Sequence, residues 1–182
     1  MGGVHDFEKS LAMSHAASDW GGWEDVYRTA FQSFSAMVDH RQDGPHQRAG
    51  IDRSVILANS KQFLIDEKVR GRNKVTGRVY EDIALEFLSD VERKTPGWVC
   101  KPLLADYIAY AILPLGICYL LPVIQLQQAW MMHSAEWCAS YPVITAKNTT
   151  WNTDSCCVPA KVLYGAIGST LRVRFDPVEM DT

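Results

Sequence analysis

The chain has 182 residues, 47% of them hydrophobic, and its formal net charge is −3. This length and composition are sufficient for one domain with a single hydrophobic core, so we expect residues 1–182 to form one α/β domain. The negative charge excludes a globally basic surface, and any contact with nucleic acid must come from a local basic patch. The five cysteines are odd in number and lack the spacing of a disulfide framework, which favours a reduced, cytoplasmic protein.

The N-terminal part combines a polar arm with an amphipathic pattern. Residues 1–18 are polar with weak periodicity and lack the pattern of a signal peptide, which predicts a loose arm or a short helix. From Trp20 to Val38, apolar residues recur at spacings of three and four, which predicts one amphipathic helix. Glu24 lies near the start of that helix, where a carboxylate is also favoured by the helix dipole. Residues 39–50 have the composition of a loop.

Two apolar runs, 54–58 and 62–69, surround the polar pair Asn59-Ser60 and predict a hairpin of two strands. Asp52 opens the first run, and the second contains Asp66 and Lys68. Residues two apart on a strand project from the same face, so the Asp66 carboxylate and the Lys68 ammonium should be neighbours, with Asp52 returned toward them. Two carboxylates and an amine are suited to a hard divalent cation and an activated water.

A basic cluster follows the second strand. It stands among glycines with no acidic residue before Glu81 and comprises Lys68, Arg70, Arg72, Lys74 and Arg78. Such a segment beside a metal site suits contact with phosphates, whose charge supplies most non-specific affinity for nucleic acid. A solvated hairpin loop is the alternative.

The rest of the chain predicts further strands and helices. Residues 82–91 read as a third strand, and residues 123–137 as a second amphipathic helix. The apolar run 107–124 has the length of a membrane span, but Pro114, Gly116 and Pro122 interrupt it, so we expect two buried strands joined by a turn. The tail predicts an irregular or β segment, a short helix opened by Pro159, and a last strand.

Asp52, followed by Asp66-Glu67-Lys68 after an apolar strand, resembles the PD-(D/E)xK (restriction-endonuclease-like) nuclease superfamily. Ile51 stands where that motif has proline. The segment from Gly97-Trp98 to Ala105-Asp106-Tyr107 is similar to prophage-type nucleases of this superfamily. The resemblance implies a central mixed sheet of four to five strands flanked by helices. The nuclease-like core would span residues 19–138, and residues 139–182 would form a C-terminal β/α extension.

The resemblance also implies site residues. Asp52, Asp66 and Lys68 would be catalytic, and Glu24 would join the two aspartates in holding Mg²⁺, or Mn²⁺. Arg70, Arg72, Lys74 and Arg78 would contact nucleic acid. Glu67 projects from the opposite strand face and should not bind the metal.

Three functions are compatible with these observations. The first is a Mg²⁺-dependent endonuclease acting on DNA in the cytoplasm, which is the host cytoplasm if the chain is phage-encoded. The second is a nucleic-acid-binding or assembly protein of the same fold without catalysis. The third is an unrelated soluble α/β protein in which Asp66-Glu67-Lys68 is an ordinary strand edge. No membrane partner is expected, and a homodimer is left open.

Overall fold

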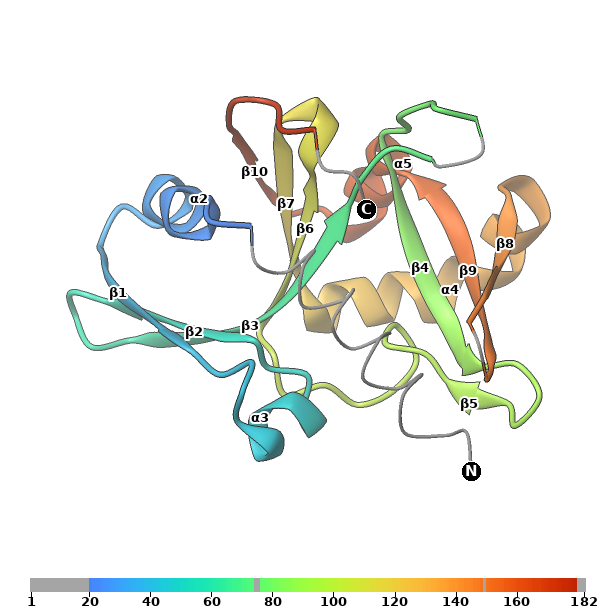
Figure 1. Ribbon diagram of the computed structural model, residues 1–182, viewed down its shortest axis with the longest axis horizontal. Coiled ribbons are helices and arrows are strands. Elements are labelled where there is room, and N and C mark those ends of the chain that lie inside the picture. Colours follow the sequence, from blue (N-terminus) through green and yellow to red (C-terminus); the bar gives the residue numbers. More distant parts are fainter. Residues whose placement is uncertain (1–19, 74–75, 149, 180–182) are drawn as a thin grey trace. The chain divides into compact units, whose positions relative to one another are not determined.

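The computed structural model describes residues 20–73, 76–148 and 150–179, and the predicted arm at residues 1–18 lies outside them. These residues form an α/β protein with two sheets and several helices (Figure 1). They divide into two compact units. One contains Glu81–Pro102 and Ile124–Gly168, and the other contains residues 20–80, Leu103–Val123 and 169–179.

The unit that contains the predicted hairpin is built on a six-stranded mixed sheet of order β1-β2-β3-β6-β7-β10. Its strands are β1 (Phe34–Asp39), β2 (Arg53–Leu57), β3 (Gln62–Arg70), β6 (Tyr107–Ile112), β7 (Ile117–Pro122) and β10 (Leu171–Arg174). β3 and β6 are parallel, and the remaining ladders are antiparallel. The sheet therefore has more strands than the four to five expected.

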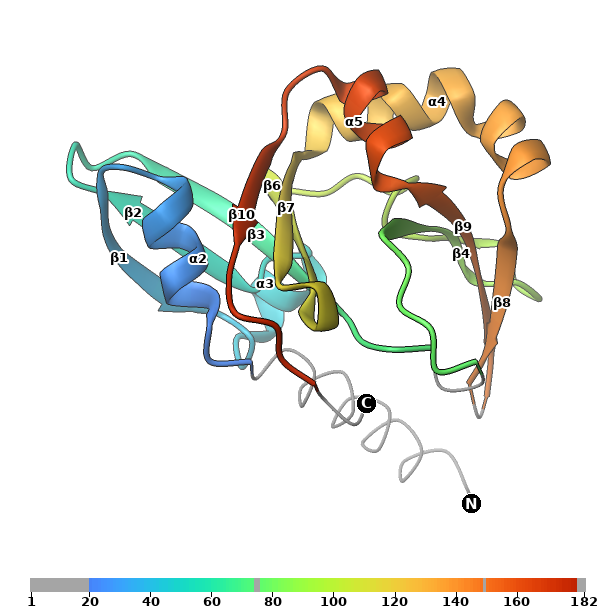
Figure 2. The ribbon, with the colours of Figure 1, turned by 90° about the horizontal axis from the view of Figure 1, so that it is seen from above.

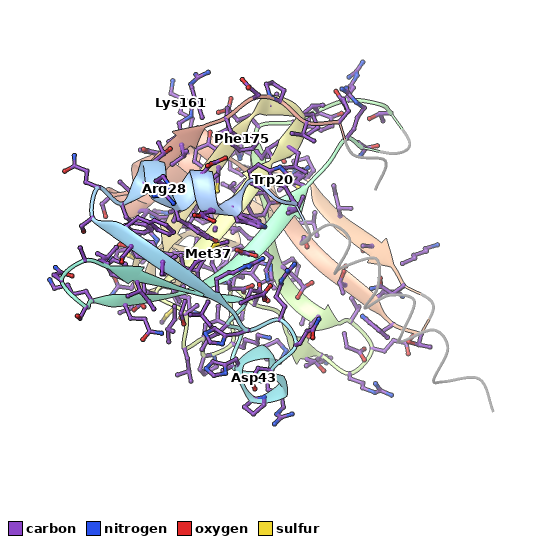
Figure 3. The ribbon with its side chains drawn as sticks, turned by 60° about the vertical axis from the view of Figure 1, so that its left-hand side comes forward. Trp20, Arg28, Met37, Asp43, Lys161 and Phe175 are labelled. Carbon is purple, nitrogen blue, oxygen red and sulfur yellow. The ribbon has the colours of Figure 1, made fainter. Side chains whose placement is uncertain are left out.

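Helix α2 (Trp23–Ala30) covers one face of this sheet and packs against β1 and β10 (Figure 2). Its buried residues Trp23, Val26 and Tyr27 have the spacing of one helix face. They share a hydrophobic core with side chains from the facing strands, and Met37 of β1 packs against that core (Figure 3). At the edge of this layer the rings of Trp20 and Phe175 lie 4.5 Å apart.

The predicted helix over residues 20–38 is wrong in its second half. α2 ends at Ala30, and β1 begins at Phe34 and pairs with β2. The apolar pattern of a helix extends to Val38 in the sequence because Phe34, Met37 and Val38 are apolar. A strand permits the same spacings, so the pattern does not distinguish the two structures here. Pairing with β2 supplies the backbone hydrogen bonds that a longer helix would have made. The predicted loop 39–50 also contains a short helix, α3 (Gly44–Arg48).

The prediction of two buried strands within residues 107–124 is confirmed. β6 and β7 form an antiparallel hairpin around a 3₁₀ turn, η1 (Leu113–Leu115). Gly116 follows this turn with φ 61°, and a Cβ at this position would lie 2.2 Å from the Phe175 carbonyl oxygen, so only glycine fits. Among the described residues, no helix combines the length and apolar character that crossing a membrane requires.

The other unit has a four-stranded antiparallel sheet of order β5-β4-β9-β8. The strands of this sheet are β4 (Asp82–Asp90), β5 (Thr95–Pro96), β8 (Val143–Lys147) and β9 (Asn152–Pro159). The unit also contains helix α5 (Ala160–Ile167) and helix α4 (Val123–Ser140), whose first residue, Val123, is assigned to the other unit. The predicted third strand is therefore a strand, but it belongs to this second sheet. The predicted helix after Pro122, the helix after Pro159 and the last strand are all present.

Neither unit is one continuous stretch of the chain, and a core at 19–138 with an extension at 139–182 stays a prediction. β4 joins β9 in one unit, whereas β10 returns to the sheet of the other unit. The expectation of one domain stays a prediction.

Candidate functional site

The β2–β3 hairpin has two chemically different faces. In its antiparallel register Arg53 pairs with Ile65 and Ser54 with Leu64. Because side chains alternate along each strand, Arg53 and Glu67 project toward α2, while Asp52, Asp66 and Lys68 project from the opposite face. We call these the helix-covered face and the carboxylate face of the hairpin.

Asp52, Asp66 and Lys68 come together on the carboxylate face, as the strand spacing predicts. Lys68 Nζ lies 2.5 Å from Asp66 Oδ1. The Asp52 carboxylate accepts a hydrogen bond of 2.7 Å from the backbone N–H of Glu67, which fixes it beside β3. The side chain of Asp66 is 6% exposed and that of Lys68 is 31% exposed, so the amine reaches solvent from a buried carboxylate.

Burial raises the pKa of Asp66 to about 6. The ammonium of Lys68 opposes this rise, whereas the charge of Asp52 and a hydrogen bond between the two carboxyl groups add to it. The two carboxyl groups therefore face each other at short range. A buried carboxyl beside a second acid is stabilised either by a proton or by a cation, which is the requirement of a metal ligand.

Glu67 lies on the helix-covered face in a buried polar cluster. Its Oε1 accepts a 2.7 Å hydrogen bond from the hydroxyl of Tyr27, and Arg53 Nε lies 3.2 and 3.3 Å from its two carboxylate oxygens. Arg53 also pairs with Asp39 of β1 at 3.1 Å. This cluster of Tyr27, Arg53, Glu67 and Asp39 ties α2, β1, β2 and β3 together.

Burial dominates the ionisation of this cluster as well. It raises the pKa of Glu67 to about 7, against the opposing charge of Arg53 and the hydrogen bond from Tyr27. It also raises the pKa of Tyr27, and the neighbouring Glu67 adds to that rise. The backbone N–H of Glu67 donates to Asp52 on the carboxylate face, but the Glu67 side chain is hydrogen-bonded to Tyr27 and Arg53 on the helix-covered face.

The basic segment lines a cavity of about 230 Å³. Its walls are Val69, Arg70, Gly71, Arg72, Asn73, Arg78 and Tyr80. Arg70 is two residues beyond Lys68 on the same strand face, and its guanidinium lies 3.5 Å from the hydroxyl of Tyr110. Arg72 pairs with Glu179 and donates to the carbonyl of Gly77 at 3.0 Å. Lys74 lies outside the described residues.

Glu24 is not brought to the two aspartates as a third ligand. It is on α2, above the helix-covered face, where its half-exposed carboxylate pairs with Arg28 at 2.6 Å. Across residues 20–73, 76–148 and 150–179, the group of histidine, cysteine and acidic side chains close enough to share one metal ion is His40, Asp43 and His46. The predicted set of Glu24, Asp52 and Asp66 does not form such a group there.

Several of these residues carried a signal in the sequence that was missed. Arg53 follows Asp52 directly, so alternation places it opposite the carboxylates and beside Glu67, and a buried arginine requires an acidic partner. His40 and His46 surround Asp43 at a spacing of three residues on each side. Tyr27 lies in the stretch for which the sequence predicts an amphipathic helix, and only the packing of α2 brings its hydroxyl to Glu67.

Comparison with protein-family models, with curated protein sequences and with solved structures gives no match for this chain.

Proposed function

We propose that this protein is a metal-dependent nuclease with a restriction-endonuclease-like core, and that it hydrolyses phosphodiester bonds of DNA. The observation that carries the proposal is the meeting of Asp52, Asp66 and Lys68 on the carboxylate face of one hairpin. A mixed sheet with α2 on one of its faces supports the core that this superfamily resemblance implies.

The donor set fits a hard divalent cation. Asp52 and Asp66 offer carboxylate oxygens, and Mg²⁺ is commonly bound in proteins by one or two carboxylates together with waters and substrate phosphate oxygens. Burial and the neighbouring Asp52 raise the pKa of Asp66 to about 6, and a cation bound at the two carboxylates would favour the ionised form. Bound Mg²⁺ supplies Lewis-acid polarisation of a phosphoryl oxygen and a water of lowered pKa.

Lys68 is the residue that acts on the reacting groups. Asp66 holds its Nζ in place at 2.5 Å, and its partial exposure lets the amine reach a phosphate or a water on the carboxylate face. From there Lys68 orients the attacking water and donates to a non-bridging oxygen as negative charge develops. The Glu67 N–H keeps Asp52 oriented while this happens.

The arginines of the basic segment hold the substrate. Arg70 continues the row of Asp66 and Lys68 along β3, and Arg72 and Arg78 line the adjacent cavity. One guanidinium group can donate hydrogen bonds to two oxygens of the same phosphate. The cavity therefore suits a phosphate group next to the one at which the DNA backbone is cleaved. This contact is independent of base sequence.

The test is cleavage of supercoiled plasmid and of a labelled single strand with Mg²⁺ or Mn²⁺. We expect the wild-type protein to cleave and Lys68→Ala to lose on the order of 10²–10⁴-fold in rate, the usual contribution of a positioned acid–base group. Lys61→Ala is the matched control, because Lys61 is an exposed lysine in the turn between the same two strands. It should cleave as the wild type does.

Two outcomes separate the alternatives. Cleavage that survives in Lys68→Ala would place the activity elsewhere and overturn the assignment. Absence of cleavage by folded wild-type protein, combined with DNA binding that weakens in Arg70→Ala, would favour a nucleic-acid-binding protein without catalysis, for which the arginine-lined cavity is the specific observation.

A further inference from the structure

A group of three metal-ligating side chains lies beside the proposed nuclease site. One ligand atom each from His40, Asp43 and His46 comes within 4.8 Å of the others. His40 directly follows β1, Asp43 lies in the turn before α3, and His46 lies within α3 (Figure 3 labels Asp43). Two imidazoles and one carboxylate form a donor set that suits zinc and similar transition metals rather than Mg²⁺.

The backbone fixes these three residues relative to the sheet. The N–H of His40 donates to the carbonyl of Asp52 at 2.8 Å, and the N–H of Asp43 donates to the carbonyl of His40 at 2.8 Å. The carbonyl of His46 accepts from the N–H of Ile51 at 3.0 Å. The group is therefore anchored at both ends to Ile51 and Asp52, the two residues directly before β2.

The side chains are already oriented by hydrogen bonds. Nε2 of His40 lies 2.7 Å from Ser54 Oγ, which also accepts a hydrogen bond of 2.6 Å from Gln62. This contact leaves Nδ1 of His40 as its ligand atom. Orientation of a ligating imidazole through its second nitrogen is the usual arrangement at metal sites in proteins.

His46 and Asp43 are joined by a contact that a metal would replace. Nδ1 of His46 lies 2.7 Å from Asp43 Oδ2. Zinc–nitrogen distances of about 2.0–2.1 Å in a tetrahedral site place ligand atoms about 3.3 Å apart. Small rotations of the partly exposed side chains of Asp43 and His46 produce that separation. The ring of His46 now stacks on that of His40 with centroids 4.1 Å and planes 11° apart, so metal binding requires the partly exposed His46 ring to turn out of this stack until both nitrogens point at one ion.

We propose that His40, Asp43 and His46 form a binding site for a transition-metal ion of the zinc class, distinct from the Asp52–Asp66 pair. Water would complete the coordination. His40 directly follows β1, which pairs with β2, and its ring contacts Ser54 on the carboxylate face. The ion would therefore lie on that face of the sheet.

Titration of the full chain with Co²⁺, followed by visible absorption, tests the proposal without using catalysis. We expect a band that saturates at one equivalent and that Zn²⁺ displaces. In His46→Ala the affinity should fall by more than the roughly 10–100-fold that loss of an outer partner causes, and Ser54→Ala should fall within that range. His133→Ala is the matched control, because His133 is a partly exposed histidine of α4.

Asp66→Asn provides the second control. It should keep the Co²⁺ band of the wild type, which separates this site from the proposed nuclease site. Absence of the band in folded wild-type protein would overturn the proposal. A band of unchanged affinity in both His40→Ala and His46→Ala would overturn it too, since the ion would then be held elsewhere. Circular dichroism of each variant establishes that it is folded.

Discussion

Asp66 and Glu67 are adjacent on β3 and both are buried, but their side chains meet different partners. Glu67 accepts hydrogen bonds from Tyr27 and Arg53, so its carboxylate oxygens are satisfied by groups of the protein itself. Asp66 has the ammonium of Lys68 and, beside it, the like-charged Asp52. The pKa is raised at both positions, to about 6 for Asp66 and to about 7 for Glu67.

This comparison separates two uses of a buried acid. The ionisation of Glu67 is governed by neighbours that are part of the fold, and breaking that cluster should damage stability. The ionisation of Asp66 is governed by a site that is open toward solvent through Lys68, and adding a cation there should change it. Removing a partner should therefore lower activity on the carboxylate face, whereas on the helix-covered face it should destabilise the fold and leave activity nearly unchanged.

The largest expected effect is the difference in activity between two matched neutral variants. Asp66→Asn removes a metal ligand worth several kcal/mol of transition-state stabilisation and should lower the cleavage rate by on the order of 10³-fold or more. Glu67→Gln keeps its shape and its backbone N–H, so its rate should stay within about tenfold of the wild type. Steady-state cleavage of one labelled substrate measures both. Equal losses would show that the assignment of faces is wrong.

The second effect concerns stability. Arg53→Ala leaves Glu67 buried without its cation, and loss of one partner of a buried pair destabilises by about 3–5 kcal/mol. Urea denaturation at pH 7.5 measures the change in the free energy of unfolding. Arg28→Ala is the control, because its ion pair with Glu24 is solvent-exposed and such pairs contribute about 0–1 kcal/mol. A change for Arg53→Ala as small as the control would contradict a structural role for the cluster.

The hairpin and its faces could be predicted from the sequence because they depend on local pattern. Alternation along 62–69 was sufficient to separate Asp66 and Lys68 from Glu67. The break between α2 and β1 was missed, because Phe34 and Met37 satisfy a helical stripe and a strand face equally well. Pairing with β2 decides between them, and that pairing is non-local.

The assignment of β4 to the other sheet was missed for the same reason. Its apolar alternation predicts a strand, but nothing within residues 82–91 indicates that β9, about seventy residues later, is its partner. The His40 group was missed because it depends on how the turn before α3 folds back on β2. Local pattern therefore predicted elements and faces, whereas partners required the fold.

The third effect is a pH dependence that distinguishes the two acids. The pKa of Asp66 rises from an ordinary 3.8 to about 6, so the folded state binds more protons than the unfolded state between about pH 4 and 6. The free energy of unfolding therefore falls as pH rises through that window. Asp66→Asn should remove the part of this fall that comes from Asp66, and should be more stable than the wild type at pH 7.5 by on the order of 1–3 kcal/mol. Glu67 produces a similar fall from its ordinary 4.5 to about 7.

Urea denaturation at a series of pH values, with and without Mg²⁺, makes the measurement. Mg²⁺ should flatten the part of the profile that belongs to Asp66, because a bound cation favours the ionised carboxylate, and should leave the part that belongs to Glu67. A profile that Mg²⁺ does not alter, or that it alters equally in Asp66→Asn, would contradict the metal site.

The smallest expected effect comes from Tyr27→Phe, which removes one hydrogen bond from Glu67 and leaves both contacts with Arg53. The free energy of unfolding should fall by about 1 kcal/mol. The pKa of Glu67 should rise further, because the hydroxyl of Tyr27 stabilises its ionised form. The fall in stability with pH would then extend to higher pH in this variant, while its cleavage rate stays that of the wild type. A reduced rate with unchanged stability would place Tyr27 in the active site and remove the distinction between the two faces of the hairpin.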